Sequence, residues 1–92
     1  MEFVTLSDVN VGSFEMETTQ NGTAVAKFSV ADNQKDRNGN EFPAWHNCKV
    51  YGQTAEYLQR NNAKGRRVSL AGARMYWQYE GEQYDVIEVA SI

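Results

Sequence analysis

The chain has 92 residues and a net charge of −3, from nine Lys and Arg against twelve Asp and Glu. This length fits a single domain, residues 1–92. No stretch approaches the ~18 apolar residues of a membrane span, and the first residues lack the basic and apolar regions of a secretory signal. With one cysteine and one histidine, we expect neither a disulfide framework nor a metal site. A reduced, cytoplasmic location fits best, with no cofactor and no membrane partner.

Strand patterns dominate the chain. Asn21-Gly22 and Glu80-Gly81 are turn signals between apolar stretches, as in tight hairpins. The polar segment 32–43, which contains Asn38-Gly39, predicts a long mobile loop, with Pro43 just before the next strand. The strands are predicted at residues 3–6, 12–19, 24–31, 44–51, 67–78 and 83–90.

One helix is predicted over about residues 54–61, after Gly52, and Asn61-Asn62 and Gly65 end it. Gly72, inside a long strand, indicates a bulge or sharp bend. About five strands with one short helix after the third long strand predict an all-β, five-stranded Greek-key OB-fold barrel. The last two strands can extend beyond the barrel as a β-hairpin arm. Strand count alone also permits a β-sandwich or another small barrel.

The charges are unevenly distributed. Residues 1–26 and 80–92 each carry four acidic residues and no base, whereas residues 27–79 carry all nine basic residues against four acidic ones. A bound polyanion feels the local field, because screening acts over about 8–10 Å. The middle of the chain can therefore attract a polyanion, although an ordinary solvated surface also explains this pattern.

The segment Trp45–Tyr51 is the most informative. Because side chains alternate along a strand, Trp45, Asn47, Lys49 and Tyr51 share one face, and His46, Cys48 and Val50 share the other. Flat rings with a cation between them are typical of surfaces that bind single-stranded nucleic acid. The alternative is that Trp45 and Tyr51 belong to the barrel core, but Lys49 on the same face argues against burial.

A second aromatic group lies before the turn at Glu80-Gly81. Met75, Trp77 and Tyr79 share one face of the strand, and Arg74 and Gln78 share the other. Three such side chains near a hairpin tip are not expected to be all core, so they predict a binding surface. A protein–protein contact is the alternative.

Basic side chains provide candidate phosphate contacts. Lys64, Arg66 and Arg67 surround Gly65 between the helix and the next strand. Such a turn can follow a phosphate backbone, or it can be only a solvated turn that favours the helix C-terminus. Lys27 and Arg74 are further candidates.

No catalytic constellation is present in the sequence. His46 is the only histidine, and we interpret His46 and Cys48 as structural because both face the core. No glycine pattern of a nucleotide-binding loop is found. We therefore expect no enzymatic activity.

Four further motifs are residues 21–26 (NGTAVA), 44–46 (AWH), 50–56 (VYGQTAE) and 88–89 (EV). In order and spacing they resemble the bacterial single-stranded DNA-binding proteins. This resemblance covers about residues 3–89. It implies an OB fold and a homo-oligomer, a tetramer rather than a dimer. By position, it also implies that Trp45 and Tyr51 stack on bases, with Tyr79 or Trp77 as a further stacking ring. His46 matches a histidine at a subunit interface of the family.

The chain departs from the family at several positions. Ser7-Asp8 stands where the family has a glycine, and Glu17 stands where it has a basic residue. The aromatic of the loop after the second long strand is missing, near Lys35. The family carries an acidic C-terminal tail, and the sequence stops at Ile92, before such a tail. We expect either a DNA-binding domain alone or a short relative.

The leading hypothesis is sequence-independent binding and protection of single-stranded DNA in replication, recombination and repair, with replication proteins as possible partners. One alternative is a short primosomal OB-fold protein that acts mainly through protein contacts. The other is a structural oligomerisation module. The predicted DNA-binding residues are Trp45, Asn47, Lys49, Tyr51, Trp77, Tyr79, Lys27, Arg66, Arg67 and Arg74.

Overall fold

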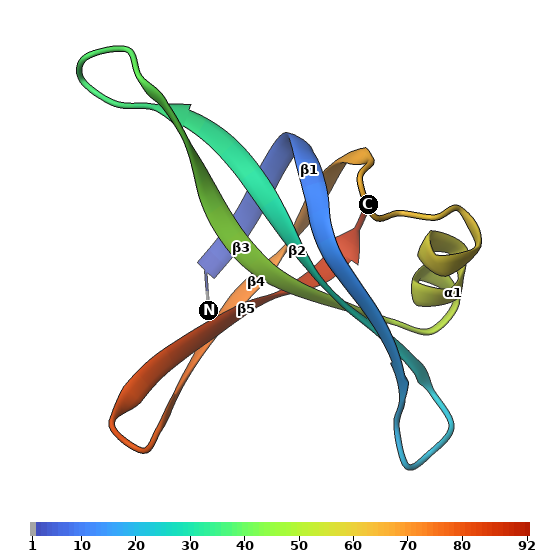
Figure 1. Cartoon of the computed structure of the whole chain (residues 1–92). Coiled ribbons are helices and arrows are strands. Elements are labelled where there is room, and N and C mark those ends of the chain that lie inside the picture. Colours follow the sequence, from blue (N-terminus) through green and yellow to red (C-terminus); the bar gives the residue numbers. More distant parts are fainter. Residues whose placement is uncertain (1) are drawn as a thin grey trace.

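The computed structural model describes residues 2–92, which form a closed five-stranded barrel (Figure 1). The strand order is β1-β2-β3-β5-β4, and every neighbouring pair is antiparallel except β3 and β5. The predicted OB-type barrel, with one helix after the third long strand, is confirmed. The elements are β1 (Glu2–Thr18), β2 (Ala24–Lys35), β3 (Glu41–Tyr51), α1 (Gly52–Arg60), β4 (Arg67–Tyr79) and β5 (Glu82–Ser91).

The first strand is continuous, so the prediction of two separate strands at its ends was wrong. The pairing register shifts between Leu6 and Val9 and again between Val11 and Phe14, and Asp8 in the first shift has a φ of 56°. Such bulges bend a strand without ending it. The first half of β1 therefore pairs with β4 and the second half with β2, which closes the barrel.

The predicted loop over residues 32–43 was also wrong. Strands β2 and β3 continue to pair as far as Lys35 and Glu41, and Pro43 lies within β3. Only residues 36–40 form the turn, where the Asp36 carboxylate accepts hydrogen bonds from two backbone N–H groups. Backbone pairing does not need apolar side chains, so a polar sequence can extend a hairpin. We call residues 32–44 the β2–β3 arm, which projects from the barrel in Figure 1.

A second hairpin, formed by β4 and β5, projects from the same end of the sheet, because β3 and β5 run parallel (Figure 1). The pairing of β4 with β1 begins at Arg74, so the paired segments Met75–Tyr79 and Glu82–Val86 lie beyond β1. We call residues 75–86 the β4–β5 arm; it confirms the predicted extended hairpin. The register shift between Ala71 and Gly72 confirms the predicted bulge, and a Cβ at Gly72 would collide with the backbone of β5.

The barrel interior is filled by small and branched side chains. Val9, Val30, Cys48 and Ile87 are the largest fully buried ones, and helix α1 adds Ala55 and Leu58. Helix α1 begins two residues before the predicted start. Because alternate residues of each strand fill the core, the others form the outer surface. Among residues 2–92, no helix is long and apolar enough to cross a membrane.

Candidate nucleic-acid interface

The predicted alternation along β3 is confirmed. Cys48 and Val50 are buried, whereas Trp45 is 59% exposed and Tyr51 is 42% exposed. Asn47 is exposed and Lys49 half-buried on the same outer face. The alternative that Trp45 and Tyr51 belong to the core was therefore wrong, and both rings have surface available for a ligand.

The Trp45 indole lies across two neighbouring strands. A Cβ added at Gly12 of β1 would lie 2.6 Å from Trp45 Cζ3 and 3.1 Å from the Ser29 Oγ of β2. Ala31, the partner of Trp45 on β2, is buried although it faces outward with it. The residues of β1 and β2 that lie beneath the indole therefore have small side chains or none.

Two lysines lie side by side on the outer face. Lys27 of β2 is the cross-strand partner of Lys49 of β3, and its Nζ lies 3.0 Å from the Glu17 Oε2. Lys49 Nζ lies 5.5 Å from the centroid of the Tyr51 ring. The interaction with the neighbouring Tyr51 side chain raises the pKa of Lys49, burial lowers it, and the charge of Glu88 raises it, so that the net change is upward. Lys49 is therefore cationic at neutral pH.

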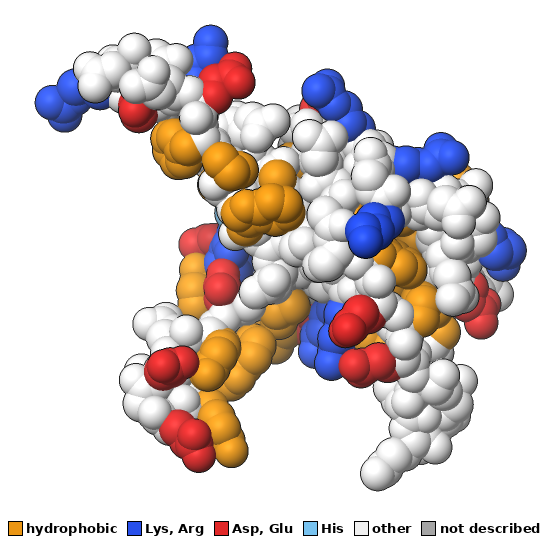
Figure 2. Space-filling model, in the orientation of Figure 1, with side chains coloured by type: hydrophobic (Ala, Val, Ile, Leu, Met, Phe, Trp, Pro, Cys, Tyr) orange, Lys and Arg blue, Asp and Glu red, His pale blue; other side chains and the backbone are white. Residues whose placement is uncertain are grey.

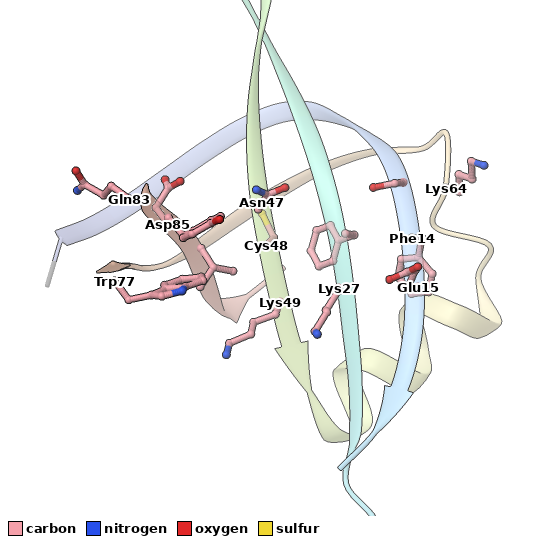
Figure 3. A pocket seen from close by; sticks show the side chains of 14 residues that line it. Phe14, Glu15, Lys27, Asn47, Cys48, Lys49, Lys64, Trp77, Gln83 and Asp85 are labelled. Carbon is pink, nitrogen blue, oxygen red and sulfur yellow. The ribbon is translucent and has the colours of Figure 1, made fainter. Parts of the chain in front are cut away.

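A groove of about 890 Å³ crosses this face (Figure 3). Lys64 lines one end and Trp77 the other, and Lys27 and Lys49 lie between them in the view. The groove thus joins predicted site residues from three strands, β2, β3 and β4, whereas the predicted stacking rings Trp45, Tyr51 and Tyr79 lie outside its lining. Its lining residues are Ser13, Phe14, Glu15, Lys27, Phe28, Asn47, Cys48, Lys49, Lys64, Trp77, Gln83, Tyr84, Asp85 and Val86.

The outer face of the β4–β5 arm is aromatic. Trp77 is 48% exposed and Tyr79 is 63% exposed, and Figure 2 shows hydrophobic side chains along this hairpin at the lower left. The Trp77 ring is stacked on Tyr84 with a centroid distance of 5.8 Å and an interplanar angle of 19°. Sequence reasoning missed Tyr84. Pairing outward from the turn at Glu80-Gly81 places Tyr84 opposite Trp77, and this register could have found it.

Arg74 does not face the groove. Its side chain is 12% exposed and forms ion pairs with Asp85 at 2.6 Å and Glu2 at 3.1 Å. Its Nη2 lies 3.1 Å from the His46 Nδ1. Burial lowers the pKa of Arg74, but hydrogen bonds to Asp85 and Glu2 raise it, and the net change is upward. Two carboxylates already compensate its charge, so we remove Arg74 from the predicted DNA contacts.

The basic turn after helix α1 lies beside β1. Gly65 donates a backbone hydrogen bond to the Val11 carbonyl, and Val11 donates one to the Arg66 carbonyl. Arg66 and Arg67 are exposed, and Arg67 lies 3.0 Å from Asp8. The turn therefore places exposed cations near the end of the groove that Lys64 lines.

The surroundings of His46 and Cys48 differ from those of catalytic residues. Burial raises the pKa of the Cys48 thiol to about 12, although the charge of Arg74 lowers it. A buried neutral thiol is a poor nucleophile. The Nε2 of His46 is buried with no hydrogen-bond partner among the described residues. Within residues 2–92, no group of His, Cys, Asp and Glu could hold a metal ion.

A closed barrel of this topology, with rings and lysines on the outer face of β2 and β3, is typical of the OB-fold proteins that bind oligonucleotides. Residues 6–92 match the model of the single-strand binding protein family. The chain belongs to this family.

Curated relatives agree with this family. The chain is 32% identical over 69 residues to a single-stranded DNA-binding protein of Borreliella burgdorferi, which covers 70% of this chain and 46% of the relative. It is 35% identical over 83 residues to that of Neisseria meningitidis serogroup A, with 79% and 48% covered. The chain thus spans about half the length of these relatives.

Solved structures share the fold. The single-stranded DNA-binding protein from Thermus aquaticus has a TM-score of 0.77 and 21% identity, over 99% of this chain and 48% of its own. The protein PriB from Ralstonia solanacearum has a TM-score of 0.71 and 14% identity, over 99% and 94%. At these identities the likeness shows the fold alone.

Proposed function

We propose that this chain binds single-stranded DNA without sequence preference. The outward row of β3, from Trp45 through Asn47 and Lys49 to Tyr51, is the observation that carries the proposal, because the groove beside it continues to Trp77. Unstacked bases offer ring faces in every sequence, so a surface of exposed rings binds them without reading their edges. Membership of the single-strand binding protein family supports the same substrate.

Each side chain has a separate role in this proposal. Bases stack on Trp45, Tyr51, Trp77 and Tyr79, and each stack contributes on the order of 1–3 kcal/mol. Lys27 and Lys49 contact phosphates in the middle of the groove, and Asn47 adds a polar contact between the rings. Arg66 and Arg67 extend the basic path beyond Lys64. Contacts to phosphate release counterions, so binding weakens as salt increases.

The biological role is a further part of the proposal, and membership of the single-strand binding protein family supports it. We propose that the chain protects single-stranded DNA during replication, recombination and repair in the cytoplasm, together with other replication proteins. We also propose a homo-oligomer, a tetramer rather than a dimer, with His46 near the interface, because a barrel of this size gains stability from further burial. Light scattering tests assembly: a mass equal to the monomer's 10.4 kDa would contradict it.

Fluorescence anisotropy with labelled oligo(dT) tests the proposed DNA binding. The protein is titrated into the oligonucleotide and into duplex DNA of equal length, at low and at raised salt. We expect strong binding of oligo(dT), lower affinity as salt increases, and much weaker binding of duplex DNA, whose bases are already stacked. Equal binding of duplex and single strand would contradict stacking. An absence of binding to either would favour a protein that acts through protein contacts or a structural module.

A further inference from the structure

Strand order determines what lies between the two aromatic regions of the groove. Strand β5 lies between β3 and β4 in the barrel, so a DNA strand that passes from Lys49 to Trp77 crosses β5. The aromatic side chain of β5 that lines the groove is Tyr84. We propose that Tyr84 is a further DNA-binding residue, which stacks on a base and positions the Trp77 ring. This inference rests on the proposed function.

The geometry around Tyr84 fits both roles. Tyr84 is the cross-strand partner of Trp77, and the two rings are stacked at 5.8 Å with an interplanar angle of 19°. Tyr84 is 40% exposed, which leaves ring surface for a base. Its hydroxyl donates a hydrogen bond to the Glu82 Oε2 at 3.1 Å. The ring is therefore held in place before DNA arrives.

Preorganisation explains why a paired ring binds better than a single one. An isolated exposed tryptophan must lose rotamer freedom when a base stacks on it. The Trp77 indole, already supported by Tyr84, loses less. Tyr84 also lines the same groove as Asn47 and Lys49, so a base next to Tyr84 keeps its phosphate close to a cation.

The same arm provides a matched control. Tyr76 is 53% exposed and neighbours Trp77 in the sequence, but it has the opposite parity and pairs with Asp85. It is not among the residues that line the groove. A substitution at Tyr76 therefore removes the same side chain from the same hairpin without changing the proposed path.

The test measures the dissociation constant of oligo(dT) for four proteins: the parent, Tyr84→Ala, Tyr84→Phe and Tyr76→Ala. For Tyr84→Ala we expect weakening of roughly 5- to 150-fold, the equivalent of one lost base–aromatic stack. For Tyr84→Phe, which keeps the ring, and for Tyr76→Ala, we expect about twofold or less. Circular dichroism establishes that each variant is folded. If alanine disturbs the arm, Tyr84→Thr, which suits a strand, replaces it with the same expected loss.

The outcomes separate the two claims. If the parent does not bind oligo(dT), the proposed function fails. If the parent binds and Tyr84→Ala binds as well as Tyr76→Ala, the function stands and the role of Tyr84 is overturned. Equal weakening by Tyr84→Phe and Tyr84→Ala would also overturn it, because the hydroxyl bond to Glu82 would then matter and the ring face would not.

Discussion

The two hairpin arms have the same backbone architecture but different side chains. In both arms, paired strands continue beyond the barrel into a short turn, and they project from it in Figure 1. The β2–β3 arm has polar and charged residues around its tip, including Lys35, Asp36 and Arg37, whereas the β4–β5 arm has Trp77, Tyr79 and other rings. The shape of an arm therefore does not indicate whether it binds DNA. Its outward side chains, and whether they are continuous with the groove, indicate this.

Removal of one ring from each arm gives the largest expected difference. Trp77→Ala should weaken oligo(dT) binding by about 1–3 kcal/mol, the contribution of one stacked base. Phe42→Ala on the β2–β3 arm is the matched control, since Phe42 is 43% exposed against 48% for Trp77 but does not line the groove. It should leave affinity within about 0.5 kcal/mol. Isothermal titration calorimetry measures both, and equal losses would mean that the arms do not differ in binding.

Substitution of Gly12, which lies beneath the Trp45 indole, gives the next largest expected effect on DNA affinity. In Gly12→Ala the new Cβ would overlap the indole, at 2.6 Å from Cζ3, so the ring must move. A displaced indole loses contact with its base, so we expect oligo(dT) affinity to fall by about 1 kcal/mol, the lower end of the contribution of one stacked base. A double-mutant cycle with Trp45→Phe is the control, because phenylalanine lacks the overlapping atoms. If Gly12→Ala weakens binding equally in both backgrounds, the glycine does not act through Trp45.

The sequence predicts the outer face of β3 well, because strict alternation leaves few ways to place Trp45 and Lys49. It predicts the β2–β3 arm poorly. Polar residues are typical of loops, but backbone hydrogen bonds also pair polar strands. It cannot predict the partners of Arg74 either, because Glu2 and Asp85 meet it only when three strands assemble.

Removal of the Glu17 charge should have a smaller effect on DNA affinity, in the opposite direction. Its carboxylate lies 3.0 Å from Lys27 Nζ, and both side chains are about half exposed. An exposed pair of this kind contributes about 0.2–1 kcal/mol, and phosphate must replace it. Glu17→Gln should therefore strengthen oligo(dT) binding by up to that amount and steepen its salt dependence. Glu56→Gln on helix α1 is the charge-matched control, and an equal gain there would indicate only a general charge effect.

The tip of the β2–β3 arm gives the smallest expected effect. Lys35 and Arg37 are exposed, but Asp36 and Glu41 beside them balance their charge, and none of them lines the groove. Lys35→Gln with Arg37→Gln should change affinity at moderate salt by less than about 0.5 kcal/mol. Anisotropy titrations measure the change. A loss as large as that of Trp77→Ala would place this arm on the DNA path.

The most direct test of the central claim uses the two tryptophans as reporters. In Trp45→Phe only Trp77 emits, and in Trp77→Phe only Trp45 emits. Oligo(dT) is titrated into each protein while tryptophan emission is recorded, with anisotropy as an independent measure of binding. We predict quenching in both proteins, with midpoints that match the anisotropy curves, because both rings stack on bases of one bound strand. Binding by anisotropy without quenching of either tryptophan would contradict a DNA path along this face.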